Sequence, residues 1–125
     1  MKLFFHEDIL YKFIVIHYYE MGQDLVEFYI KNRKLYFIYV KETKYNTHFM
    51  EDDFDLNKSE YYEVRSYFKN YELIHQICSK DSNVRIYDKD ILVSDYFYYI
   101  DFFNEKSKVI DSLTNIKGKS YLLLR

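Results

Sequence analysis

A cysteine and a histidine three residues apart are the side chains best suited to covalent chemistry in this chain. Cys78 is the only cysteine, and His75 would lie on the same face if residues 57–78 formed a helix. A thiolate beside an imidazole is a candidate nucleophile. That face would also carry Val64 and Phe68, as a buried core does, and a lone cysteine is commonly buried. We therefore interpret His75 and Cys78 as structural and predict no catalytic residue.

A cluster of carboxylates at residues 51–55 is the second chemical candidate, because hard cations bind oxygen ligands. Asp53, Asp55 and Asn57 match the first, third and fifth positions of a calcium-binding loop. A lysine then replaces the glycine that such a loop requires, and a valine replaces its bidentate glutamate. Because both decisive positions fail, the sequence predicts no metal site and no cofactor.

Phosphate and nucleic-acid binding find little support in the sequence. The two glycines, Gly22 and Gly118, lie in no phosphate-binding loop. The net charge is −2, and no basic stripe runs along any predicted element. Nucleic-acid affinity depends on cations that neutralise phosphates, so we do not expect nucleic acid as a partner.

The first element predicted along the chain is a β-sheet. Apolar and aromatic residues alternate with others over residues 9–19, where β-branched and aromatic types dominate, and this pattern is typical of a strand. Residues 26–31 alternate in the same way. Asn32-Arg33 fits a hairpin tip before a further apolar run at 35–41. The sequence predicts a three-stranded antiparallel meander over residues 9–41.

A change of the apolar period from 2 to 3.6 near residue 57 predicts a helix over residues 57–78. Asn57 and Glu60 fit a capping pair at its start. The core face of this helix would comprise Tyr61, Val64, Tyr67, Phe68, Tyr71, Ile74, His75 and Cys78. A thinner apolar stripe would lie on the opposite side, formed by Tyr62, Leu73 and Ile77.

The segment SDYFYYIDFF, residues 94–103, fits a strand by composition and a helix by period. The helical period continues well beyond it, and a glycine follows where a C-cap belongs. We favour a helix over about 95–116, which places Tyr96, Tyr99 and Phe103 in the core.

A short hairpin over 84–93 and a C-terminal strand over 120–124 complete the predicted elements. No linker, repeat or low-complexity segment divides the 125 residues, a length typical of one domain. The expected fold is a single α+β domain in which an antiparallel β-meander is packed with two main helices.

Composition and charge also suggest an origin and a compartment. The chain has 16 Tyr and 11 Phe but no Pro or Trp, a bias typical of AT-rich genomes and common in phage and viral genes. One cysteine permits no internal disulfide, which fits a reducing compartment. Charges at positions 7 and 8 interrupt the stretch where a signal peptide would be apolar, and no apolar run could span a bilayer. We expect a cytoplasmic protein with no membrane partner.

The negative charge is concentrated in residues 51–63, which carry one basic and six acidic side chains. Clustered carboxylates steer association with basic surfaces, and tyrosine is enriched at protein interfaces. The alternative interpretation of such a run is an ordinary solvated loop. The predicted partner-binding residues are Glu51, Asp52, Asp53, Asp55, Tyr62, Glu63, Leu73 and Ile77.

These patterns favour a small non-enzymatic inhibitor that binds and neutralises a partner protein. It would resemble in style an immunity protein, or a phage or viral inhibitor of host defence such as an anti-CRISPR. The partner would be a toxin, nuclease or defence effector with a basic surface. Two alternatives stay open: a small enzyme or metal-binding protein with an unrecognised site, and a structural or oligomerising viral component. Self-association therefore also stays open.

Overall fold

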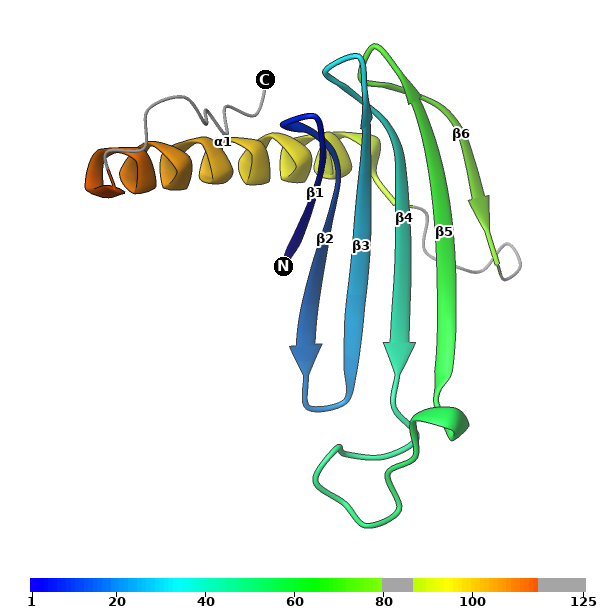
Figure 1. The fold of residues 1–125 in the computed structure, drawn as a ribbon. Helices are drawn as coiled ribbons and strands as arrows, with labels where there is room; N and C mark the ends of the chain where they lie inside the picture. Colours follow the sequence, from blue (N-terminus) through cyan, green and yellow to red (C-terminus); the bar gives the residue numbers. More distant parts are fainter. Residues whose placement is uncertain (80–86, 115–125) are drawn as a thin grey trace.

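Residues 2–78 form one antiparallel sheet whose six strands lie in chain order (Figure 1). The computed structural model describes residues 1–79 and 87–114. The strands are β1 (Lys2–His6), β2 (Ile9–Tyr19), β3 (Gly22–Lys31), β4 (Lys34–Lys44), β5 (Glu60–Lys69) and β6 (Glu72–Cys78). The predicted meander over 9–41 is confirmed as β2, β3 and most of β4, and the sheet extends beyond it on both sides.

Three of the hairpins turn through two residues in the left-handed region of backbone conformation. These pairs are Glu7-Asp8, Asn32-Arg33 and Asn70-Tyr71, with φ between 50° and 66°. Two consecutive positive φ angles define the turn whose twist matches that of the flanking strands. Asparagine tolerates this conformation well, so the predicted tip at Asn32-Arg33 is confirmed and Asn70 marks a second tip of the same kind.

The sheet has two different faces because side chains alternate along each strand. The helix-side face is apolar, and one cross-strand row on it comprises Val15, Val26, Val40, Val64 and Cys78. The open face carries residues of the other parity, among them Tyr39, Glu63 and Arg65. Only the first of these faces is covered by a helix.

Helix α1 (Lys89–Thr114) crosses the strands of the sheet (Figure 1). Its buried side chains Leu92, Tyr96, Ile100 and Phe103 recur at helical spacing. The Phe103 ring meets the Phe13 ring edge-on at a centroid distance of 5.2 Å. The aromatic segment 94–103 is therefore helical, with Tyr96 and Phe103 in the core and Tyr99 half-buried beside them, as predicted.

The start of α1 corrects the predicted hairpin over 84–93. Asp88 caps the helix, since its Oδ1 accepts hydrogen bonds from the backbone N–H groups of Asp90 and Ile91, and residues 89–93 are helical rather than extended. A side-chain cap satisfies amide groups that have no partner within the helix. Residues 84–86 and the predicted strand at 120–124 lie outside the described residues.

The predicted helix over 57–78 is wrong, because residues 60–78 form the hairpin β5–β6. Tyr62, Val64 and Phe68 do line a buried face, but with the period of a strand. A strand becomes stable when its backbone groups pair with a neighbour, and β5 pairs with β4 along its length. Within residues 1–79 and 87–114, the α+β expectation therefore holds only as one sheet with one main helix, α1.

Candidate functional site

The 45–59 loop lies beside the turn between β2 and β3 (Figure 1). Large apolar side chains are exposed on these two segments and next to them. We call loop-end patch the set Tyr18, Met21, Phe49, Met50, Leu56 and Tyr61. The exposed fraction reaches 71% at Tyr18 and 73% at Met50. A hollow of about 670 Å³ lies at this end, lined by Tyr18, Phe49 and Leu56 among others. Grouped exposed apolar side chains are typical of contact surfaces.

The loop that carries the patch is held in place by the strands beside it. The Tyr45 N–H donates to the Met21 carbonyl at 2.8 Å, and the Phe49 N–H donates to the Glu20 carbonyl at 3.2 Å. The rings of Tyr45 and Phe54 pack edge-on at 4.9 Å. An ordered loop loses less conformational entropy on binding than a flexible one, so the patch is preorganised.

The predicted acidic segment follows Phe49 and Met50 of the patch in the chain, but its four carboxylates differ in role. Glu51, Asp52 and Asp53 are exposed. Asp55 is half-buried, and its Oδ1 accepts a hydrogen bond of 2.9 Å from the Asn57 N–H, which caps the short 3-10 helix η1 (Leu56–Lys58). Three of these carboxylates thus face solvent, whereas Asp55 shapes the loop.

The other four predicted binding residues do not share a surface. Tyr62 is buried on the helix-side face and Leu73 is half-buried against the core, while Glu63 and Ile77 lie on the open face. The sequence analysis placed these residues on the predicted helix over 57–78. That placement is wrong, because they lie on strands, and successive residues of a strand point to opposite faces. A role for any of them in binding stays a prediction.

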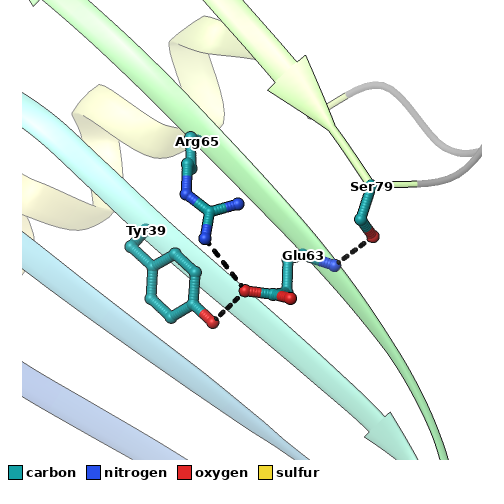
Figure 2. Close-up of polar contacts among 4 residues, drawn as sticks. All are labelled: Tyr39, Glu63, Arg65 and Ser79. Atoms are coloured by element: carbon teal, nitrogen blue, oxygen red, sulfur yellow. Dashed lines mark hydrogen bonds and ion pairs between the residues drawn. The ribbon is translucent and has the colours of Figure 1, made fainter.

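Glu63 joins two central strands on the open face (Figure 2). Its Oε2 accepts a hydrogen bond of 2.6 Å from the Tyr39 hydroxyl and one of 3.1 Å from Arg65 Nη2. The Glu63 N–H donates to Ser79 Oγ. The hydrogen bond from Tyr39, assisted by the charge of Arg65, lowers the pKa of Glu63. Burial and the bond to Glu63 raise the pKa of Tyr39 to about 12.

His75 and Cys78 lie on opposite faces of β6. His75 stands opposite Tyr67 on the open face, while Cys78 stands opposite Val64 on the helix-side face. His75 is exposed and Cys78 is half-buried against the core. The shared face inferred from helical geometry is wrong, and the two side chains cannot form a thiolate–imidazole pair across the sheet.

A second hollow, which we call the helix-side cleft, lies between the first turns of α1 and the strands β2, β3 and β4. Alternation places His17, Asp24 and Glu42 in one cross-strand row, one step beyond the row of valines. The cleft has a volume of about 310 Å³. Its apolar surface is formed by Val15, Val26, Phe28, Val40, Ile91 and Leu92.

The rim of the helix-side cleft is acidic. Asp24, Glu42, Asp88 and Asp95 line it together with His17, Tyr87 and Tyr99. Among the described residues that line the cleft, none is a lysine or an arginine. Partial burial raises the pKa of the Asp95 carboxyl, and the nearby His17 opposes this shift. Four carboxylates therefore share a small space with a single imidazole.

Hydrogen bonds orient the groups on this rim. The Tyr19 hydroxyl donates to Asp24 Oδ2 at 2.8 Å, and the Tyr87 hydroxyl donates to Glu42 Oε1. His17 Nε2 and the Tyr99 hydroxyl are hydrogen-bonded at 3.2 Å. Tyrosine hydroxyls are neutral donors, so these hydrogen bonds bring no positive charge to the rim.

Within residues 1–79 and 87–114, no three His, Cys, Asp or Glu side chains are grouped so that they could hold a metal ion. The described part of the chain also contains no helix long and apolar enough to cross a membrane. Comparison with known proteins found no matching family model, no similar curated protein and no similar solved structure. A functional proposal for this chain therefore has to come from the geometry of its described residues.

The helix-side cleft was not predicted from the sequence. The available signal was a polar residue that continues an apolar row along a strand. Three residues fit this description, because each comes just before or just after alternating apolar residues: His17, Asp24 and Glu42. The residues on α1 come from much further along the chain, and the bond between His17 and Tyr99 joins residues 82 positions apart. Only strand register and helix docking bring the two groups together.

Proposed function

We propose that this protein acts by binding a partner protein with a basic surface, and that it neutralises that partner as an inhibitor of the immunity-protein or anti-defence type. The loop-end patch supplies the apolar contact, and the exposed carboxylates that follow Met50 in the loop supply charge complementarity. The observation that carries the proposal is the placement of exposed Phe49 and Met50 directly before the exposed carboxylates of Glu51, Asp52 and Asp53.

This arrangement matches the general anatomy of protein interfaces. An interface has an apolar, aromatic-rich centre and a polar rim, and aromatic anchors provide much of the binding energy. Carboxylates at the rim increase the association rate with a basic partner, and salt screens this effect. The preorganised loop supports the same function, because it limits the entropy lost on binding.

The test begins with capture of partners from the native host by tagged protein, followed by affinity and activity measurements on each purified candidate. The Glu51→Lys, Asp52→Lys, Asp53→Lys triple variant should associate at least tenfold more slowly at low salt, with a weaker salt dependence. Phe49→Ala should increase the dissociation rate. Both variants should inhibit the partner less than the wild type does.

The matched control reverses three carboxylates elsewhere, with Glu7→Lys, Asp8→Lys and Glu105→Lys. These residues are exposed and lie in the β1–β2 turn and on α1. If the control slows association as much as the loop variant does, net charge and not the loop-end patch governs binding. If neither variant alters affinity or inhibition while both remain folded, the proposal is wrong.

A further inference from the structure

An aromatic row crosses the open face of the sheet on its last three strands. Register places Phe37 of β4 opposite Tyr67 of β5, and Tyr67 opposite His75 of β6. The ring centroids are 4.9 Å apart in the first pair and 6.0 Å apart in the second. We call these three residues the ring row. Because α1 packs on the other face of the sheet, it does not cover these rings.

The rings of the ring row are accessible and held in place. Tyr67 and His75 are exposed, and Phe37 is half-buried. The Tyr29 ring of β3 packs against the Phe37 ring at 5.3 Å, and Lys12 Nζ lies over the Tyr29 ring at 4.8 Å. Neighbouring rings on a sheet surface are suited to stacking flat ligands, and every nucleobase offers a flat face.

Basic side chains gather at the turns beside the ring row. Lys31 stands opposite Lys34, and the preceding pair faces the core, so alternation places both lysines on the open face. Lys34 Nζ donates to Asn70 Oδ1 at 3.0 Å, which ties the β3–β4 turn to the β5–β6 turn. We call basic turns the four exposed cations of this region: Lys31, Arg33, Lys34 and Lys69.

The carboxylates on the open face of β3, β5 and β6 are paired with other cations. The three ion pairs are Lys12–Glu27, Arg65–Glu63 and Lys89–Glu72, with N–O distances of 3.0, 3.1 and 2.9 Å. Within residues 1–79 and 87–114, no carboxylate forms an ion pair with the basic turns. Glu7 and Asp8 lie in the β1–β2 turn, at the edge of the sheet opposite β6. The surroundings of the ring row are therefore positively charged.

We propose that the ring row is a platform for single-stranded nucleic acid, whose bases stack on the rings while its phosphates meet the cations of the basic turns. Charge complementarity favours this occupant over an apolar protein surface, and stacking requires bases that are not already paired in a duplex. No nucleic-acid partner was expected from the sequence, because no predicted element carries a basic stripe. The sheet instead brings the cations together from two turns.

This surface is separate from the one proposed for partner binding. The β3–β4 and β5–β6 turns lie at one end of the sheet, and the 45–59 loop lies at the other (Figure 1). The inference therefore does not depend on the proposed function, and nucleic-acid binding can be measured with the protein alone.

The experiment measures fluorescence anisotropy of labelled oligothymidylate and oligouridylate of about 10 nucleotides titrated with the intact protein. The matched probe is an abasic strand with the same number of phosphates. We expect at least one of the two base-containing strands to bind at least tenfold more tightly than the abasic strand. The logarithm of its affinity should fall with the logarithm of salt concentration with a slope of about −3 if all four cations contact phosphates. No binding, or equal affinity for the abasic strand, would overturn the proposal.

Substitutions in the ring row test the stacking. Tyr67→Ala should weaken oligonucleotide binding about tenfold or more, whereas Tyr98→Ala, at an exposed tyrosine on α1, should leave it unchanged. Should Tyr67→Ala fail to fold, His75→Ala on the edge strand β6 takes its place with the same expectation. Unchanged binding in the folded variants would overturn the inference. So would a stable dimer that Tyr67→Ala dissociates, because a second copy would then occupy the row.

Substitutions at the basic turns test the phosphate contacts. The Lys31→Gln, Lys69→Gln double variant should reduce the salt slope by about half. The matched control is Lys44→Gln, Lys58→Gln, which removes two exposed lysines at the other end of the sheet. It should leave the slope unchanged. An equal reduction in both variants would mean that net charge alone governs the affinity, and would overturn the assigned site.

Discussion

The Tyr39 hydroxyl donates a hydrogen bond of 2.6 Å to Glu63 Oε2, which links β4 to β5 on the face that α1 does not cover. Arg65 donates to the same oxygen and lies over the Tyr39 ring at 5.1 Å. The three side chains form a closed network of charge-assisted contacts. Its strength depends on the ionised state of Glu63, so it can be probed through pH.

Tyr39→Phe should raise the pKa of Glu63, because the hydrogen bond from Tyr39 is the main cause of its lowered value. A carboxyl with a lowered pKa in the folded state stabilises the fold above its unfolded pKa, and this contribution is lost as pH falls through the folded pKa. The wild type should therefore exceed the variant in stability near neutral pH, and the difference should shrink below about pH 4.

Carboxyl carbon chemical shifts followed through an acid titration would measure the change at Glu63. Tyr36→Phe is the matched control, since Tyr36 lies on the same strand and is exposed. An identical titration of Glu63 in wild type, Tyr39→Phe and control would contradict the assigned cause.

Tyr96→Phe should leave stability unchanged or increase it by about 1 kcal/mol. Tyr96 is fully buried, and its hydroxyl has no hydrogen-bond partner among the described residues. A buried hydroxyl without a partner opposes folding because it loses its hydration. Denaturant unfolding measures the effect, with exposed Tyr98→Phe as the control. A loss of more than about 1 kcal/mol would show that the hydroxyl is satisfied.

Gly22→Ala should destabilise the protein by about 1–3 kcal/mol. A Cβ at Gly22 would lie 2.4 Å from the Thr43 carbonyl oxygen, a backbone atom that cannot move without disturbing the pairing of β3 with β4. Met21→Ala, at the exposed neighbour, provides the comparison in thermal unfolding. Equal stability of the two variants would mean that the strands separate there at little cost.

Asp55→Ala should destabilise the protein by about 1 kcal/mol through loss of the cap on η1. The neighbouring Asp53→Ala should have a smaller effect, because Asp53 is exposed and Asn46 bonds its backbone carbonyl. Hydrogen exchange of the Asn57 and Ser59 amides should accelerate in the Asp55 variant alone. Similar exchange in both variants would argue against the cap.

Cys78→Ser should destabilise the protein by roughly 1 kcal/mol, because it places a hydroxyl against the apolar core. His75→Ala should be close to neutral, since His75 is exposed on the other face. Denaturant unfolding compares the two variants, and partner inhibition should survive both substitutions whenever the protein is folded. Loss of inhibition with intact stability would assign these residues a direct role.

Sequence patterns gave correct predictions where the spacing of apolar residues fitted only one kind of secondary structure. The alternation over 9–41 and the tip at Asn32-Arg33 predicted the meander, and the helical spacing of Tyr96 and Phe103 predicted the buried face of α1. The exposed carboxylates Glu51, Asp52 and Asp53 were also accessible to prediction, because charged side chains between elements seldom become buried.

The hairpin β5–β6 was missed because residues 57–78 contain apolar residues at both periods. Val64 and Phe68 fit a helical stripe, and with Tyr62 they equally fit a strand. The turn at Asn70-Tyr71 resembles the one at Asn32-Arg33, and asparagine between two apolar runs was the available clue. The spacing of the apolar residues alone does not select between the two periods.

The amino-acid sequence by itself determined the local features: alternating faces, left-handed turn positions, the amphipathic α1 and the concentration of acid in residues 51–63. The tertiary structure decided that residues 60–78 are strands, because their backbone groups pair with β4 and with each other. It also created the helix-side cleft. His17, Asp24 and Glu42 meet through strand register, and Asp95 joins them only because α1 docks on that face of the sheet. These residues come together through strand register and helix packing between distant parts of the chain, and the local spacing of apolar residues carries no information about either.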